Sequence, residues 1–230
     1  RNSVGHPISA FYGYQVAGYF KDANDVSKSP TQADAAPGRF KYADLNHDGK
    51  ISDSDRTFFG NPNPKFTYGL TLNASYKSFD ATIVFYGSYG NDAINYTRYW
   101  TDFWASFQGN KSKNLLYNSW STTNLNPKAP ILENASTFST NTVPNSFYKE
   151  SASFFKCRSL IIGYNMAPDL LKKAGIDRFR LFVQGSNLFT ITKYTGLDPE
   201  LSGNTQAFGI DFGNYPNNQR TYIVGVNLGF

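Results

Sequence analysis

The last eleven residues, Arg220-Thr221-Tyr222-Ile223-Val224-Gly225-Val226-Asn227-Leu228-Gly229-Phe230, decide how the rest of the chain is interpreted. Apolar side chains occupy every second position and mostly small or polar ones alternate with them, which predicts a β-strand. An outer-membrane barrel strand has such a face, because it meets lipid and carries aromatic residues at the interface. A buried last strand of a soluble sandwich would look similar. The apolar row comprises Tyr222, Val224, Val226, Leu228 and Phe230.

The composition limits how this chain could meet a membrane. Of its 230 residues 17% are aromatic, with 16 Tyr and 20 Phe. No apolar run approaches the ~20 residues of a transmembrane helix, so strands would have to cross. The net charge of +5 is scattered and predicts no nucleic-acid partner. The single Cys157 excludes an internal disulfide. Because the chain starts at Arg1 without Met or signal peptide, we expect a piece of a longer protein.

Residues 66–77 form the clearest predicted strand. Their length is about that of a tilted strand that crosses an outer membrane. Aromatic residues stand at both ends of the apolar row, as in the girdles of a membrane barrel. The row comprises Phe66, Tyr68, Leu70, Leu72, Ala74 and Tyr76. Further strands are predicted over residues 11–21, 79–88, 154–165, 178–189 and 220–230, with a β-bulge near Ser159, where the alternation slips.

The connections between these strands alternate in length. Counted back from a periplasmic Phe230, the polar stretches 190–219, 91–152 and 22–65 fall outside the cell. The short connections 166–177 and 77–78 fall inside, the second as a tight hairpin turn. Bacterial outer-membrane barrels have long outer loops and short inner turns. We therefore expect an all-β chain of antiparallel transmembrane β-barrel strands with long extracellular loops.

A soluble, calcium-stabilised carbohydrate-binding β-domain is the alternative. Burial separates the two, because only the membrane interpretation requires large apolar side chains to point out of the sheet toward lipid. The residues that test this are Leu70, Leu72, Ile83, Leu181, Val183, Val224 and Leu228.

Residues 44–55 match a calcium-binding loop. Oxygen-bearing side chains stand at positions 1, 3, 5 and 12, Gly49 at position 6 permits the sharp turn, and the position-seven ligand would be a backbone carbonyl. Asp replaces the usual Glu at position 12, as in dockerin-like loops. An Asx-rich turn without metal is the alternative. The predicted ligands of a structural Ca²⁺ are Asp44, Asn46, Asp48, the Lys50 carbonyl and Asp55.

The densest group of aromatic residues lies inside the expected outer loop 91–152. Such a group could bind a sugar ring or contact a partner protein, and it could equally pack on itself, since interfaces and interiors both favour Tyr, Trp and Phe. The candidates are Tyr96, Tyr99, Trp100, Phe103 and Trp104, followed by Phe107.

No catalytic arrangement is indicated, and we expect the chain not to be an enzyme. Its two histidines, His6 and His47, stand near no plausible Ser or Cys nucleophile. Four basic residues in the predicted strands are expected to face the barrel interior, namely Lys156, Arg158, Arg178 and Arg180.

Several stretches together resemble the C-terminal barrel region of SusC/RagA-type TonB-dependent transporters of Bacteroidetes. Each is modest, but they cover nearly the whole chain in the family's order. They are residues 5–14, Gly38-Arg39-Phe40, 44–51, Asp55-Arg56-Thr57, 60–66, 87–92, 143–146, 183–189 and 195–200.

The resemblance implies the C-terminal third of a barrel of about 22 strands, of which this chain would carry about seven. The plug domain would lie outside residues 1–230. Such transporters sit in the outer membrane and import oligosaccharides or oligopeptides, with energy passed through TonB to the missing N-terminal part. A SusD-like lipoprotein caps the mouth. By the same resemblance, the apolar row that ends at Phe230 would be the signal for the barrel-assembly machinery.

Overall fold

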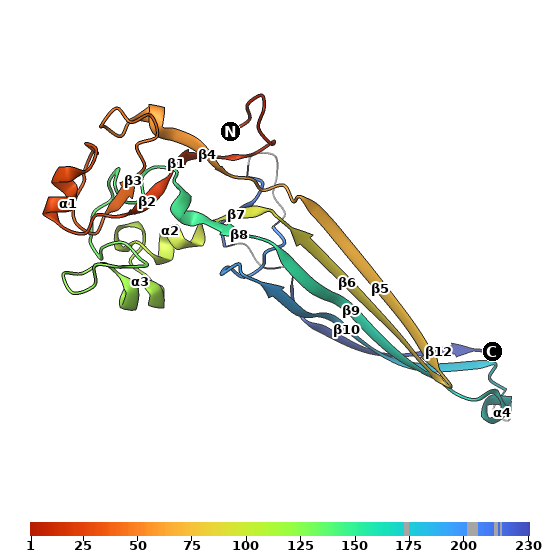
Figure 1. Cartoon of the computed structure of the whole chain (residues 1–230). Coiled ribbons are helices and arrows are strands. Elements are labelled where there is room, and N and C mark those ends of the chain that lie inside the picture. Colours follow the sequence, from red (N-terminus) through yellow and green to blue (C-terminus); the bar gives the residue numbers. More distant parts are fainter. Residues whose placement is uncertain (173–174, 202–206, 214–215, 217) are drawn as a thin grey trace. The chain divides into compact units, whose positions relative to one another are not determined.

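The computed structural model describes residues 1–172, 175–201, 207–213, 216 and 218–230 (Figure 1). The chain forms two compact units that are treated separately below. The sheet unit comprises Pro64–Asn91, Ser151–Glu200 and Tyr215–Phe230, and the loop unit comprises Arg1–Asn63, Asp92–Glu150 and Leu201–Asn214.

The sheet unit contains one antiparallel sheet of five strands in the order β12-β10-β9-β6-β5 (Figure 1). These strands confirm the antiparallel all-β expectation for the described residues. Closure of a barrel and the expected count of about seven barrel strands stay predictions. The bounds are β5 Phe66–Tyr76, β6 Phe79–Tyr89, β9 Phe154–Asn165, β10 Arg178–Thr192 and β12 Thr221–Gly229.

The strand registers bring most of the large apolar side chains to one side of the sheet, called here the apolar face, whereas Val84, Ile161, Phe182 and Ile223 lie on the other side. Directly opposed residues of an antiparallel pair share a face, and Leu72 opposes Ile83, which in turn opposes Leu160. Leu181 likewise opposes Val226 across β10 and β12. The other side, the polar face, carries residues such as Thr71, Asn73, Asp80, Gln184 and Asn227.

Aromatic residues lie at both ends of the apolar face. At one end the ring of Phe66 lies 5.3 Å from that of Tyr89. At the other end the rings of Phe79 and Tyr164 are 5.1 Å apart. Two aromatic rows flanking an aliphatic band are what a strand that crosses a bilayer requires.

The bulge expected near Ser159 is confirmed. Val84 opposes Ser159 whereas Phe85 opposes Cys157, so β9 carries Arg158 as an extra residue between them. On its other side, the β10 register shifts between Ser186 and Phe189. The extra residue in the bulge keeps Cys157 and Leu160 on the same face of the sheet although their sequence spacing is odd.

The short connections join strands at one end of the sheet. Lys77, with φ 53°, makes the turn between β5 and β6, and residues 166–177 contain the helix α4, Pro168–Leu171. The long connections all leave the opposite end, where Phe66, Tyr89 and Phe154 stand. This arrangement agrees with the alternation that the sequence predicts, although part of loop 190–219 lies outside the described residues.

The loop unit is built from short elements, so the stretches 22–65 and 91–152 are not plain loops. The expected single strand 11–21 is wrong, because this stretch is two strands in separate two-stranded sheets: β1 pairs with β4, and β2 with β3. The strands are β1 Phe11–Tyr14, β2 Val16–Tyr19, β3 Phe40–Tyr42, β4 Arg56–Gly60, β7 Asp92–Asn95, β8 Lys149–Ser151 and β11 Ile210–Asp211. The helices are α1 Ala23–Lys28, α2 Thr97–Thr101 and α3 Lys113–Asn118, with 3-10 turns at Asp53–Asp55, Trp104–Ser106 and Ser146–Tyr148.

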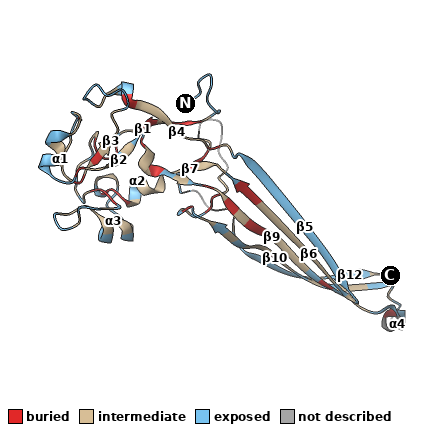
Figure 2. Ribbon diagram, in the orientation of Figure 1, coloured by how far each residue is buried: buried red, intermediate tan, exposed pale blue. Residues whose placement is uncertain are grey.

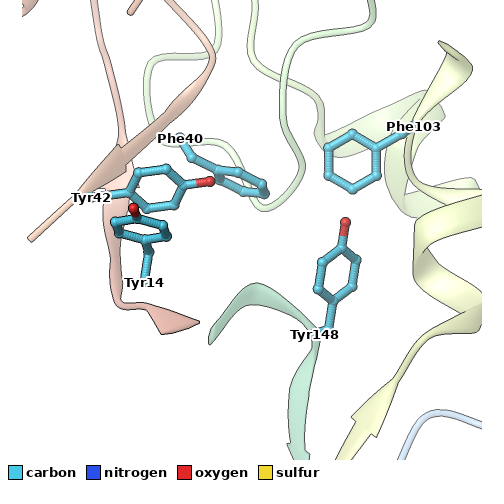
Figure 3. Packing of buried hydrophobic residues seen from close by; sticks show 5 residues of the cluster. All are labelled: Tyr14, Phe40, Tyr42, Phe103 and Tyr148. Atoms are coloured by element: carbon cyan, nitrogen blue, oxygen red, sulfur yellow. The ribbon is translucent and has the colours of Figure 1, made fainter. Parts of the chain in front are cut away.

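Aromatic side chains from distant segments form the core of the loop unit (Figure 3). The buried cluster is Tyr14, Phe40, Tyr42, Phe103 and Tyr148. Gly13 allows the 142–148 segment to approach β1, since a Cβ there would lie 2.2 Å from the carbonyl oxygen of Pro144. That carbonyl accepts a hydrogen bond from the Tyr14 amide at 2.9 Å. Figure 2 shows buried segments in both units, whereas β5 is exposed along its whole length.

Within the described part of the chain, no helix is long and apolar enough to cross a membrane.

Candidate functional site

A cavity of about 550 Å³ lies within the loop unit. Five segments that are far apart in the sequence line it: the N-terminal stretch with β1, β4, the stretch of β7 and α2, the 141–148 segment, and the residues around β11. Its size is within the range of small-molecule sites, roughly 300–1,000 Å³. The aromatic and branched residues of its wall are Phe11, Tyr12, Phe59, Ile94, Tyr96, Tyr99, Val143, Tyr148, Phe208, Ile210 and Phe212.

The aromatic wall on α2 is held rigidly by ring packing. The rings of Tyr96 and Tyr99 are stacked with centroids 5.0 Å apart and an interplanar angle of 6°. Trp100 meets Tyr99 edge to face at 4.8 Å, and Phe212 meets Tyr96 at 5.4 Å. Burial raises the pKa of the Tyr96 hydroxyl, with a smaller contribution from Tyr99. The wall is therefore neutral and mainly apolar.

The structure divides the five aromatic candidates of the sequence among three places. Tyr96 and Tyr99 line the cavity. Phe103 is 5% exposed and belongs to the buried core. Trp100 and Trp104 are exposed at the surface. The cavity residues on β1, β4 and β11 were missed, because only their aromatic character marked them and the sequence does not say which distant segments meet.

The predicted calcium loop adopts a compact turn in which the acidic side chains accept backbone hydrogen bonds. Asp44 Oδ2 accepts from the Gly49 amide at 3.0 Å, and Asp48 Oδ1 from the Lys50 amide at 3.0 Å. Asn46 Oδ1 accepts from the Asp48 amide at 3.1 Å. Gly49 has φ 82°, a left-handed conformation that suits glycine at position 6. The loop therefore turns where the sequence pattern requires it.

Two oxygens of this loop bear on the metal prediction. Asp44 Oδ1 is buried and has no hydrogen-bond partner among the described residues. The carboxylate of Asp55 is fully buried and accepts from the amides of Leu45 at 2.9 Å and Ser52 at 2.8 Å. Burial acts to raise the pKa of Asp55, but these backbone donors and that of Asn46 outweigh it, so the pKa is lowered and the group is an anion.

The carboxylates are not drawn together into a finished metal site. In the part of the chain that the structure describes, no group of three or more His, Cys, Asp or Glu side chains is arranged to hold a metal ion. The predicted set includes the Asn46 side chain and the Lys50 carbonyl, which such a grouping does not count. Metal binding through these residues thus stays a prediction, with Asp44 Oδ1 as the atom that lacks a partner.

The apolar face of the sheet unit is exposed, as the membrane interpretation requires. Leu70 is 51% and Val224 70% exposed, and every residue of β5 is exposed (Figure 2). Ile83 is half-buried. The residues predicted to form the assembly signal lie on β12 and at its end, with Tyr222, Val224, Val226, Leu228 and Phe230 all exposed.

The polar face carries ion pairs that reach across strands. Arg180 on β10 binds both carboxylate oxygens of Asp80 on β6, through Nε at 3.1 Å and Nη2 at 2.5 Å. The guanidinium crosses β9 above Gly163, where a Cβ would lie 2.5 Å from Arg180 Nε. A side chain at position 163 would therefore displace this bridge.

A second group of charges surrounds Lys156, which is 1% exposed. Its Nζ lies 2.7 Å from Glu200 Oε2 and 3.8 Å from Asp198 Oδ1, and Arg158 also binds Glu200. A buried lysine is stable only when paired in this way. The pairs fasten residues 198–200 to β9. Of the four basic residues expected to face inward, Lys156, Arg158 and Arg180 are thus ion-paired, and Arg178 stands at the start of β10.

Comparison with known proteins gives relatives that cover the chain almost completely. TonB-dependent receptor P3 of Formosa agariphila is 35% identical, over 98% of this chain and 22% of the relative. TonB-dependent receptor P26 of the same organism is 30% identical, over 99% of the chain and 23% of the relative. TonB-dependent receptor SusC of Bacteroides thetaiotaomicron is 28% identical, over 100% of the chain and 20% of the relative. No family model matches.

Solved structures show the same likeness. The RagAB peptide transporter matches with a TM-score of 0.77 and 27% identity, over 100% of this chain and 23% of that chain. The RagAB peptide importer in its open-open state matches with a TM-score of 0.75 and 27% identity, over 99% of this chain and 23% of that chain. This chain spans about a fifth of the length of the curated relatives that it matches.

The sheet with one apolar face, together with these matches, defines a class: the chain is a β-sheet segment of the TonB-dependent receptor kind. Within this class the chain belongs to the SusC/RagA type, which confirms the resemblance noted in its sequence.

Proposed function

We propose that this chain is part of the wall and outer loops of an outer-membrane, TonB-dependent transporter that imports oligosaccharides or oligopeptides. The observation that carries the proposal is the continuous apolar face of five strands, with an aromatic row at each end and a charged, hydrogen-bonded opposite face. Lipid outside and water inside account for both faces at once.

The soluble carbohydrate-binding alternative fits less well. A soluble sandwich covers its apolar face with a second sheet, whereas Leu70, Val183 and Val224 are each about half exposed or more. Contiguous apolar surface of this extent belongs to a membrane or an interface.

The proposed partners follow from the family. The relatives include SusC and the RagA component of the RagAB assemblies, and we place a SusD-like lipoprotein over the outer loops and TonB at the part of the protein that precedes this chain. The rest of the barrel and its plug would complete the pore. The apolar row ending at Phe230 is proposed as the assembly signal.

A structural Ca²⁺ in the 44–55 loop is a second part of the proposal. The buried, unpartnered Asp44 Oδ1 and the anionic Asp55 supply hard oxygen ligands, which Ca²⁺ prefers at about 2.3–2.6 Å. The loop is anchored where Ile51 packs on the aromatic core and its amide bonds to the Thr31 carbonyl at 2.8 Å. The ion would hold the loop rigid and perform no chemistry.

Fractionation and uptake test the transporter proposal. The full-length protein should appear in the outer-membrane fraction and migrate faster on a gel when unheated, as folded barrels do. Growth on the imported substrate should require both the protein and TonB. Recovery in the soluble fraction without heat-modifiability would contradict the proposal.

A further inference from the structure

We propose that the cavity of the loop unit binds an apolar side chain, preferably an aromatic one, of a peptide. The inference rests on the proposed transport function and narrows its substrate class. It concerns only the loop unit, to which all the described lining residues of the cavity belong.

The shape and the walls of the cavity fit an aromatic ring. Phe11, Phe59, Tyr96 and Phe212 line it, and aromatic pairs gain about 0.5–1.5 kcal/mol beyond the burial of their area. The stacked pair of Tyr96 and Tyr99 is braced by Trp100, so little ordering is needed when a ligand enters. A volume of about 550 Å³ has room for the side chain and adjoining backbone.

The three side-chain amides that line the cavity are already hydrogen-bonded within the protein. Asn141 donates to Ser106 Oγ at 2.6 Å and accepts from Ser136 Oγ at 2.5 Å. Asn145 accepts from the Phe147 amide at 3.0 Å and donates to the Val143 carbonyl at 3.1 Å. The third lining amide, Asn2, accepts from the Ser9 amide at 2.7 Å.

Because these amides already have partners, the cavity is poorly suited to bind a sugar. A sugar ring that enters a cavity loses water from several hydroxyl groups, and each one left without a partner costs free energy. Among the lining residues that the structure describes none is acidic, and the single cation, Arg1, has its guanidinium over the ring of Tyr12 at 4.7 Å. The hydroxyl of Tyr148 points toward the ring of Phe103 (Figure 3) and has no hydrogen-bond partner among the described residues. An apolar side chain makes no such demand, and its peptide backbone can stay at the open rim.

Calorimetry on the full-length transporter tests the proposal with three probes. These are a blocked tripeptide with a central phenylalanine, the same tripeptide with a central serine, and maltotriose. The phenylalanine peptide should bind about tenfold or more tightly than the serine peptide, the discrimination expected of an apolar pocket. Equal affinity of the two peptides would overturn the inference.

Two matched variants locate the binding. Thr142 is exposed at the cavity wall, so Thr142→Trp should narrow the cavity without disturbing the core. This variant should bind the phenylalanine peptide about tenfold more weakly. Thr122 is exposed in the loop unit outside the cavity, and Thr122→Trp should leave the affinity unchanged. Equal affinity in both variants would show that the protein's own chain fills the cavity or that peptides bind elsewhere. Loss of maltotriose binding alone in Thr142→Trp would assign the cavity to a sugar.

The same preparations separate this inference from the transporter proposal. Heat-modifiability and outer-membrane insertion report on the barrel and do not depend on the cavity. A protein that inserts but shows no preference for the phenylalanine peptide would contradict only the cavity assignment. A protein that fails to insert would contradict the transporter proposal itself.

Discussion

At the scale of single residues, Tyr148 carries a buried hydroxyl without a hydrogen-bond partner in the described residues. Such a group costs about 1–3 kcal/mol of stability. Tyr148→Phe should therefore increase the free energy of opening of the loop unit by about 1 kcal/mol. Hydrogen exchange of the Phe40 amide, which bonds to the Ser139 carbonyl at 2.9 Å, measures this opening.

Tyr42 is the matched control in the same cluster. It is equally buried, but its hydroxyl donates to the Phe138 carbonyl at 3.0 Å. Tyr42→Phe should speed exchange of the Phe40 amide, because it leaves that carbonyl without its donor. If both substitutions changed exchange in the same direction, the hydroxyl of Tyr148 would have a partner after all.

Gly163 gives a second prediction at this scale. Alanine in place of a strand glycine normally increases the stability of the folded protein by roughly 0.5–1 kcal/mol. At position 163, however, its methyl group would push away Arg180 and break the ion pair between Arg180 and Asp80. This half-exposed pair is worth up to about 1 kcal/mol. Gly163→Ala should therefore give no net gain in the denaturant midpoint of the full-length barrel.

Gly69 shows what the same change does without a bridge. It lies on the same polar face, and the nearest atom to an added Cβ is 3.7 Å away, an ordinary contact. Gly69→Ala should raise the midpoint. A rise of the same size for Gly163→Ala would mean that the Arg180 bridge contributes nothing to stability.

At the scale of elements, we predict that the loop 44–55 binds Ca²⁺. Calcium titrated into the chelator-treated full-length protein should bind with one ion per loop, and Asp44→Asn should remove that binding. At a concentration about 100-fold above the dissociation constant, the ion should add about 2.7 kcal/mol to the stability of the loop unit.

Asp53, which lies in the same loop two residues before Asp55, offers a matched control. It is exposed and lies outside the predicted ligand set, so Asp53→Asn should leave calcium affinity unchanged. If the unaltered protein gave no heat of calcium binding, the loop would be an Asx-rich turn that binds no metal.

The strand β12 tests the assignment of faces. Val226 lies on the apolar face and Asn227 on the polar face, although they are neighbours in sequence. Val226→Arg should cost about 2–4 kcal/mol if the position lies near mid-membrane. Asn227→Arg should cost only about 0.2–1 kcal/mol, because the new charge faces Arg180 across the strand pair. The measurement is the denaturation midpoint of the folded barrel in lipid vesicles, and equal losses would mean that the faces are assigned wrongly.

At the scale of the whole molecule, what the sequence could predict depends on how far apart the interacting residues are. Alternation is a local signal, and it located β5, β6, β9, β10 and β12 and even the bulge beside Ser159. The break in 11–21 was not predictable, because it depends on partners more than a hundred residues away: the Tyr14 amide bonds to Pro144 and the Val16 amide to Ser146.

The cavity, too, depends on residues that are far apart in the sequence and could be predicted only in part. Tyr96 and Tyr99 drew attention because they are close in sequence, whereas Phe11 and Phe212 reach the same space from opposite ends of the chain. Phe103 has the same local signal as Tyr99 and goes into the core instead, since its burial is decided by Phe40, Phe147 and Tyr148. Aromatic density predicted the region but not the role of each ring.

The last prediction concerns the five-stranded sheet as part of the whole chain. Its edge strands β5 and β12 each pair on one side only within the described residues, and its apolar face is exposed. Free edges and large apolar faces associate in water. The 230-residue chain produced alone should therefore form large assemblies in buffer and disperse in detergent, as seen by sedimentation velocity. Leu70→Glu with Val183→Glu should reduce the assembly, because both charges enter the apolar face. Thr71→Glu with Gln184→Glu places the same charges one residue along, on the polar face, and should leave the assembly unchanged. A monomer in plain buffer with one cooperative melt would show that the sheet needs neither lipid nor further strands.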